Sequence, residues 1–156
     1  MTRWPRWMSS IFQAEMGRVH RPIPWGECQM SKLQQPYGYE LIIDLHGCDV
    51  SKFSRKSLRE YLKKFCNAIN VKRCELYFWD DVGVPAKDKE TLPHAKGTSA
   101  VQFILTSNIT IHTLDLLKAA YVNMFSCKQF DRKVAENITK EWFGAKKCRT
   151  HFIERI

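Results

Sequence analysis

Residues 39–46 read YELIIDLH, and this stretch decides which class of fold the chain adopts. It is rich in residues that favour strands, and the turn residues Gly47-Cys48-Asp49 follow it, so it predicts a strand. Ser54 then stands as an N-cap before RKSLREYLKKFCNAI, residues 55–69. In this segment apolar residues recur at helical spacing, at Leu58, Leu62, Phe65 and Ile69. The pattern predicts a strand followed by an amphipathic helix.

The rest of the chain repeats strand patterns and closes with a second helix. Four further segments predict strands: CELYFWD (74–80), SAVQFILTS (99–107), AAYVNMFSC (119–127) and CRTHFIERI (148–156). A helix is expected to begin after Asp131 and to stop at Gly144. The order β-α-β-β-β-α-β predicts an α/β (α+β) two-layer sandwich, a mainly antiparallel sheet with helices on one face. The other sheet face is left free for a second layer or a partner.

Composition indicates one globular domain with an N-terminal extension. The chain has 156 residues, 44% of them hydrophobic. Residues 1–29 are rich in Trp, Arg and Pro without a sustained period, which predicts a disordered extension before a domain over residues 30–156. No apolar run is long enough to span a membrane, and the start lacks the apolar segment of a secretory signal. We therefore expect no membrane contact and a cytoplasmic protein.

Charge and cysteines do not indicate a particular partner. The formal charge is +9, but the basic residues are scattered and no nucleic-acid motif is present, so a solvated basic face is expected and nucleic acid is not. Six cysteines form neither a CxxC motif nor a Cys/His cluster with zinc-ligand spacing. Reduced thiols and no metal are the expectation.

Ser99, Ser107, His112 and Cys127 fall within one short block of the chain. Singly, a strand serine and a lone histidine are most often structural. Three of the four lie in GTSAVQFILTSNITIHT (97–113), and Cys127 ends VNMFSC (122–127); LIIDLHGCD (41–49) stands earlier in the chain. These segments resemble the S-adenosylmethionine decarboxylase proenzyme family in its short prokaryotic, pyruvoyl-dependent form. The resemblance extends from about Tyr37 to the C-terminus.

The resemblance implies a self-cleaving serine. Ser107 would attack the carbonyl of Thr106, and His112 would act as the base of the following elimination, a task suited to a group that titrates near neutrality. Ser99 would assist this processing. Cleavage would give a β chain ending at Thr106 and an α chain that starts with a pyruvoyl group from Ser107. That cofactor would form a Schiff base with the substrate and act as the electron sink, with Cys127 as the proton donor.

The chain also departs from the family pattern at several positions. Thr106 and Asn108 replace a glutamate and a histidine on either side of Ser107, and Asn123 replaces an aspartate. Leu116 stands at the position where the family has a substrate-binding glutamate. The neighbouring Asp115 is therefore the candidate substrate-binding carboxylate. Trp79, before the long polar loop 80–96, is the candidate aromatic for adenine, although an ordinary aromatic at a strand end is the commoner case.

Several functions remain open from the sequence. The resemblance implies decarboxylation of S-adenosylmethionine for spermidine and other polyamine biosynthesis, by a homodimer or larger assembly. The altered contact positions leave room for another amino acid, arginine or ornithine. A non-catalytic homologue with a structural or regulatory role is a further alternative, against which the joint presence of Ser107, His112 and Cys127 argues. The remaining alternative, a basic nucleic-acid-binding domain, is supported only by the positive net charge.

Overall fold

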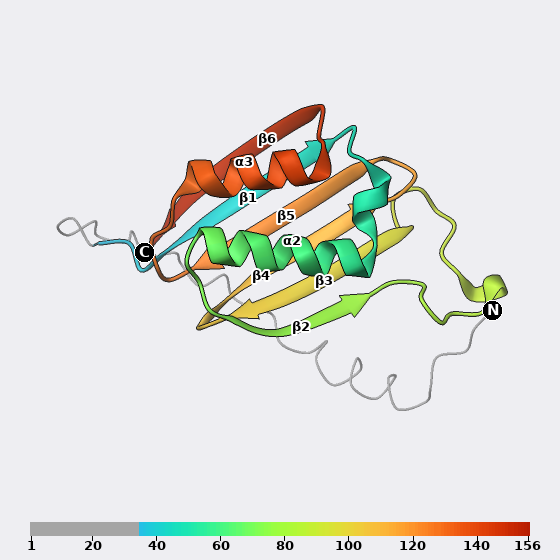
Figure 1. Ribbon diagram of the computed structural model, residues 1–156, viewed down its shortest axis with the longest axis horizontal. Coiled ribbons are helices and arrows are strands. Elements are labelled where there is room, and N and C mark those ends of the chain that lie inside the picture. The colour runs from blue at the N-terminus through green and yellow to red at the C-terminus, as the bar shows by residue number, and fades with distance from the viewer. Residues whose placement is uncertain (1–34) are drawn as a thin grey trace, which may run out of the picture. The chain divides into compact units, whose positions relative to one another are not determined.

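A computed structural model describes residues 35–156, so the predicted N-terminal extension lies outside the described part. The described chain forms one antiparallel sheet with two α-helices and two short 3₁₀ helices (Figure 1). Its strands are β1 (Gly38–His46), β2 (Arg73–Trp79), β3 (Gly97–Ile104), β4 (Ser107–Leu114), β5 (Ala119–Ser126) and β6 (Lys147–Arg155). Its helices are η1 (Val50–Phe53), α2 (Arg55–Ala68), η2 (Ala86–Asp88) and α3 (Arg132–Phe143).

The sheet has the strand order β2-β3-β4-β5-β1-β6, and every neighbouring pair is antiparallel. Figure 1 shows α2 and α3 lying side by side across one face of this sheet. The predicted α+β two-layer sandwich is therefore confirmed.

One strand was missed by the sequence analysis. Residues 99–107 were expected to form a single strand, but β3 ends at Ile104 and β4 begins at Ser107. The two strands form a hairpin in which Ile104 pairs with Ser107, and only Leu105 and Thr106 lie between them. The sheet consequently has six strands rather than five.

Local sequence explains both helices. The Ser54 side chain accepts a hydrogen bond from the backbone N–H of Ser57 at 3.3 Å, and Asp131 caps α3 in the same way. Gly144 ends α3 with a left-handed φ of 57°, a conformation that glycine adopts without steric cost. The predicted caps and stop are confirmed.

The core lies between the helices and the sheet. The predicted apolar stripe of α2 is buried, with Leu58, Leu62 and Phe65 at 0% exposure. It packs on sheet residues of one parity, which include Leu41, Ile43, Ile109, Ile111, Val122 and Met124. The opposite face, which carries Thr110, His112, Tyr121 and Asn123, is only half-buried. Among the described residues no helix covers that face (Figure 1).

Candidate active site

The hairpin between β3 and β4 holds Thr106 in an unusual backbone conformation. Its φ is +63°, in the left-handed region where glycine and asparagine are common and β-branched residues are rare. Such a conformation costs on the order of 1–3 kcal/mol and persists only where the surroundings enforce it. Here the antiparallel pairing of β3 with β4 encloses the turn, and the backbone N–H of Leu105 donates to Lys72 O at 3.0 Å. The peptide bond expected to be cleaved follows this strained residue.

Thr106, Ser107 and Cys127 are in contact at one end of the sheet. The backbone N–H of Cys127 donates to Ser107 Oγ at 3.2 Å, and Thr106 Oγ1 lies 3.0 Å from Cys127 Sγ. The hydrogen bond from Thr106 lowers the pKa of the Cys127 thiol; desolvation by burial opposes this shift, and a hydrogen bond from Ser107 adds to it. We call these three residues the cleavage cluster.

Ser99 and His112 form a second pair at the other end of β4. They face each other across β3 and β4, and Ser99 Oγ lies 2.8 Å from His112 Nδ1. A hydrogen bond at one ring nitrogen fixes the orientation of an imidazole and leaves the other nitrogen for acid–base work. We call these two residues the histidine pair.

Within one chain the cleavage cluster and the histidine pair are far apart. Ser107 is the first residue of β4 and His112 is the sixth. Because an extended strand rises about 3.3 Å per residue, about 17 Å separates the two residues along β4. A proton transfer needs heavy atoms within about 3 Å of each other. His112 of a chain therefore does not reach Ser107 of the same chain in this structure.

Two cavities adjoin the histidine pair. The first, which we call the sheet hollow, is a depression of about 350 Å³ on the uncovered face, lined by Ile42, Asp44, Ser99, His112, Tyr121 and Asn123 among others. The second, which we call the loop pocket, has about 500 Å³ and lies under the β2–β3 loop, lined by Trp79, Asp80, Glu90, His94, Ser99 and His112 among others. Ser99 and His112 line both cavities.

The two predicted substrate residues occupy different places. Trp79 is 84% exposed at the end of β2, where it pairs with Ser99 and lines the loop pocket. Asp115 is half-buried in the turn after β4, and its backbone N–H donates to Lys96 O at 3.0 Å. Desolvation by burial raises the pKa of the Asp115 carboxyl, while nearby Lys96 opposes the shift. Trp79 thus adjoins the histidine pair directly, and Asp115 lies three residues beyond it.

Sequence analysis missed two residues of the site and one contact within it. Asp44 and Tyr121 line the sheet hollow, and Tyr121 is the cross-strand partner of both Asp44 and His112. Strand alternation along 39–46 and 119–127 would have placed both on the uncovered face, but only the register makes them neighbours of His112. The contact of Thr106 with Cys127 was also unforeseen. In the described part of the chain, no group of three or more His, Cys, Asp or Glu side chains is placed to hold a metal ion.

Comparison with known proteins gives two matches. Residues 39–156 match the family model described as S-adenosylmethionine decarboxylase. Among solved structures, the crystal structure of the adenosylmethionine decarboxylase from Aquifex aeolicus is similar, with a TM-score of 0.62 and 21% sequence identity. That similarity covers 78% of this chain and 92% of the Aquifex chain, and at this identity it concerns the fold. No curated protein matches the sequence.

Proposed function

Because the chain belongs to the S-adenosylmethionine decarboxylase family, we propose that it is a self-processing, pyruvoyl-dependent decarboxylase of S-adenosylmethionine. The product of that reaction would be the aminopropyl donor for spermidine in polyamine biosynthesis. The observation that carries the self-processing part is the cleavage cluster. There a serine hydroxyl follows a strained residue and lies beside a thiol whose pKa is lowered.

The cleavage cluster suits the first step of self-processing. Ser107 Oγ attacks the carbonyl carbon of Thr106; a C–O ester bond forms, the C–N peptide bond breaks, and the Ser107 amine takes up a proton. Attack by a neighbouring hydroxyl is fast when the reacting atoms are held together. The hydrogen bond from the Cys127 backbone to Ser107 Oγ fixes that hydroxyl. The left-handed φ of Thr106 adds strain that rearrangement of the peptide bond would relieve.

The second step needs a base. Removal of the Ser107 Cα proton breaks the Cβ–O bond, which frees the carboxylate of Thr106 and leaves a dehydroalanine. Tautomerisation and hydrolysis of this residue release ammonia and leave the pyruvoyl group. His112, oriented by Ser99, is the residue we assign as the base.

Because about 17 Å of β4 separates His112 from Ser107, we infer that the His112 acting at Ser107 comes from a second copy of the chain. We propose a homodimer in which the uncovered sheet faces pack together and run in opposite directions. The histidine pair of one copy would then lie at the cleavage cluster of the other. Half-buried apolar and aromatic side chains on this face, such as Ile42, Val101 and Tyr121, support burial in an interface.

The processed site would decarboxylate a bound amino acid. The pyruvoyl group would supply an electron sink for loss of the carboxylate. Cys127 would return a proton to the substrate α-carbon, since its thiol interacts with the side chain of Ser107, the residue that becomes that group. Trp79, exposed beside the histidine pair, would offer an aromatic face to adenine or the sulfonium, and Asp115 would bind a polar part of the substrate.

We also propose a cytoplasmic location. In the described part of the chain, the cysteines Cys48, Cys66, Cys74, Cys127 and Cys148 are free thiols, as a reducing compartment would keep them. No helix among residues 35–156 is long and apolar enough to cross a membrane.

Intact mass of the purified protein tests the proposed function. We expect two fragments, divided between Thr106 and Ser107, with the second starting in a pyruvoyl group. Ser107→Ala should give one chain. Cys127→Ala should still be cleaved but should release carbon dioxide from carboxyl-labelled S-adenosylmethionine far more slowly. An uncleaved wild-type chain would refute the proposal, and faster release from labelled arginine or ornithine would change the substrate.

A further inference from the structure

The Thr106 side chain makes two polar contacts, one within the β3–β4 turn and one to the residue that follows β5, although Thr106 is exposed. Its hydroxyl donates to Leu105 O at 2.7 Å and lies 3.0 Å from Cys127 Sγ. A hydroxyl carries one hydrogen and can also accept. The Cys127 thiol can therefore donate to Oγ1 while Oγ1 donates to Leu105 O, or Oγ1 can turn its hydrogen to the thiolate. In both arrangements the hydroxyl links the β3–β4 turn to the end of β5.

Cys127 contacts both sides of the bond to be cleaved. Its Sγ touches the Thr106 side chain, and its backbone N–H holds Ser107 Oγ at 3.2 Å. The attacked carbonyl belongs to Thr106 and the attacking oxygen to Ser107, so a single residue at the end of β5 fixes the neighbours of both reacting atoms.

We propose that the Thr106 hydroxyl is a positioning group for self-cleavage, which docks the strained turn on Cys127 and keeps the Thr106 carbonyl beside Ser107 Oγ. This inference rests on the proposed function. It gives a role to a threonine at a position where glutamate would be expected from the family pattern. A glutamate would bring a charge, whereas threonine brings a short side chain that reaches the thiol directly.

Cleavage would also change the state of Cys127. While the chain is intact, the Thr106 hydroxyl is hydrogen-bonded to the Cys127 thiol. Once the bond after Thr106 breaks, that residue is the free end of the β chain and can leave the sulfur. The thiol is then available to the substrate. The same contact thus positions the turn before cleavage and is released by it.

The test uses two substitutions of similar size. Thr106→Val removes the hydroxyl but keeps the branched side chain, and Thr106→Ser keeps the hydroxyl. Loss of one hydrogen bond of ordinary strength should slow self-cleavage of Thr106→Val about two- to tenfold. Thr106→Ser should be cleaved at close to the wild-type rate. Cleavage is followed by intact mass after synthesis, and thermal melting checks that each variant folds.

A second measurement does not depend on cleavage. In a Ser107→Ala background, iodoacetamide alkylation of Cys127 is followed by mass spectrometry as a function of pH, with exposed Cys74 as the internal reference. Adding Thr106→Val should move the Cys127 inflection to higher pH and leave that of Cys74 unchanged, because the hydroxyl favours the thiolate.

The outcomes separate the two proposals. A wild-type chain that is cleaved, together with a Thr106→Val chain cleaved equally fast or an unmoved Cys127 inflection, would overturn only the role of the Thr106 hydroxyl. A wild-type chain that stays intact would overturn the proposed function and this inference together.

Discussion

Ser107 and His112 lie five positions apart on one strand, β4, and about 17 Å of extended chain separates them. Each contacts another residue at its own end of the sheet: Ser107 contacts the backbone of Cys127, just after β5, and His112 contacts the side chain of Ser99 on β3. A twofold axis that passes near the middle of β4 would exchange these ends. Such a dimer is isologous, and it would hold two equivalent sites, each built from both copies.

Complementation between two inactive variants tests the shared site. The chain with His112→Ala keeps Ser107 and Cys127 but lacks the proposed base, and the chain with Ser107→Ala keeps His112. Expressed alone, neither should be cleaved. Expressed together, the His112→Ala chain should be cleaved, because its partner supplies His112. Differently tagged chains and intact mass identify the cleaved copy.

The control for complementation is a partner that carries both Ser107→Ala and His112→Ala. It can still form the dimer, but no copy then has the base, so cleavage should be absent. If His112→Ala chains are cleaved equally with this partner, the base is not His112. If they remain uncut with either partner, the site is not shared between copies.

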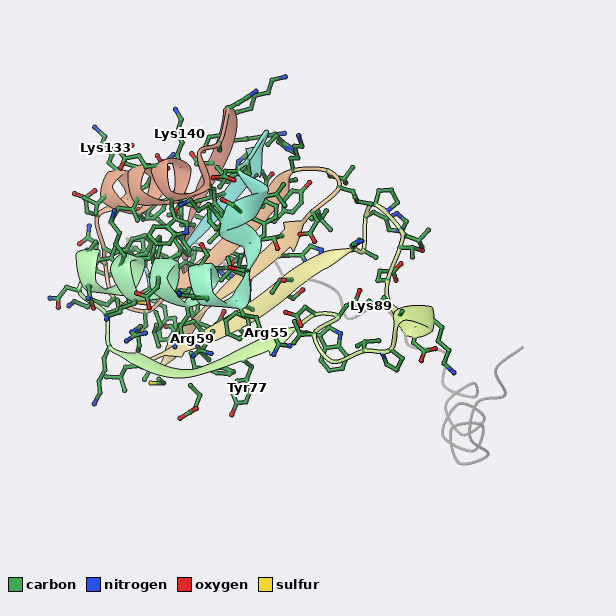
Figure 2. All side chains as sticks on the ribbon, turned by 45° about the vertical axis from the view of Figure 1, so that its right-hand side comes forward. Arg55, Arg59, Tyr77, Lys89, Lys133 and Lys140 are labelled. Atoms are coloured by element: carbon green, nitrogen blue, oxygen red, sulfur yellow. The ribbon has the colours of Figure 1, made fainter. Side chains whose placement is uncertain are left out.

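Trp79 is expected to contribute to substrate binding rather than to turnover. Stacking on an aromatic ring contributes about 0.5–1.5 kcal/mol, so Trp79→Ala should raise KM for S-adenosylmethionine about two- to tenfold with little change in kcat. Tyr77→Ala is the matched control. Tyr77 lies two residues earlier on β2, is 60% exposed, packs edge-on against Phe103 and does not line the loop pocket. Figure 2 shows Tyr77 on the side of β2 away from Arg55 and Arg59. Equal effects of the two substitutions on KM would contradict a specific role for Trp79.

Gly97 is expected to be indispensable for the pairing of β3 with β4. A Cβ at this position would overlap Thr113 O, a backbone atom that cannot move without opening the sheet. Gly97→Ala should therefore destabilise the fold by about 3 kcal/mol and impair cleavage. Urea unfolding in the Ser107→Ala background measures the change.

Gly83→Ala provides a control for Gly97→Ala. Gly83 has a φ of +85° in the β2–β3 loop, and a Cβ added there would meet nothing within 4 Å. Its replacement should cost only about 1 kcal/mol, the strain of a left-handed alanine. Equal losses at the two sites would show that close approach to Thr113 is not the reason for Gly97.

The Arg55–Asp80 ion pair should make stability depend on pH. It joins the start of α2 to the residue after Trp79 by two hydrogen bonds of 2.7 and 2.5 Å. The Arg55 guanidinium holds the pKa of the Asp80 carboxyl below its ordinary value. A depressed pKa in the folded state adds stability above the unfolded pKa, and this is lost as the pH falls through the folded pKa.

Asp80→Asn should lower the free energy of unfolding at pH 7 and reduce its difference between pH 7 and pH 3, as measured with urea. Asp88→Asn, on an exposed residue of η2, is the control and should change neither quantity appreciably. An Asp80→Asn protein with the full wild-type pH dependence would show that this pair does not contribute.

Much of the fold could be predicted because its signals are local. The apolar stripe of α2, the caps Ser54 and Asp131, and the stop at Gly144 are each encoded within a few residues. The split of residues 99–114 into two strands was missed for an equally local reason. Its turn is Leu105-Thr106, without the glycine or asparagine that usually marks a two-residue hairpin. The pairing of β3 with β4 holds the β-branched Thr106 at a positive φ, and no local sequence pattern predicts this.

By itself, the sequence determined which chemical groups are present and how far apart they are along the chain, because these are properties of the covalent polymer. It therefore brought Ser99, Ser107, His112 and Cys127 into one family pattern. Only the tertiary structure decided which of these groups touch. Strand register joined Ser99 to His112 and Thr106 to Cys127, and the rise of an extended strand kept His112 away from Ser107. Contacts across a sheet depend on pairing between distant segments, and this pairing is fixed only when the core packs.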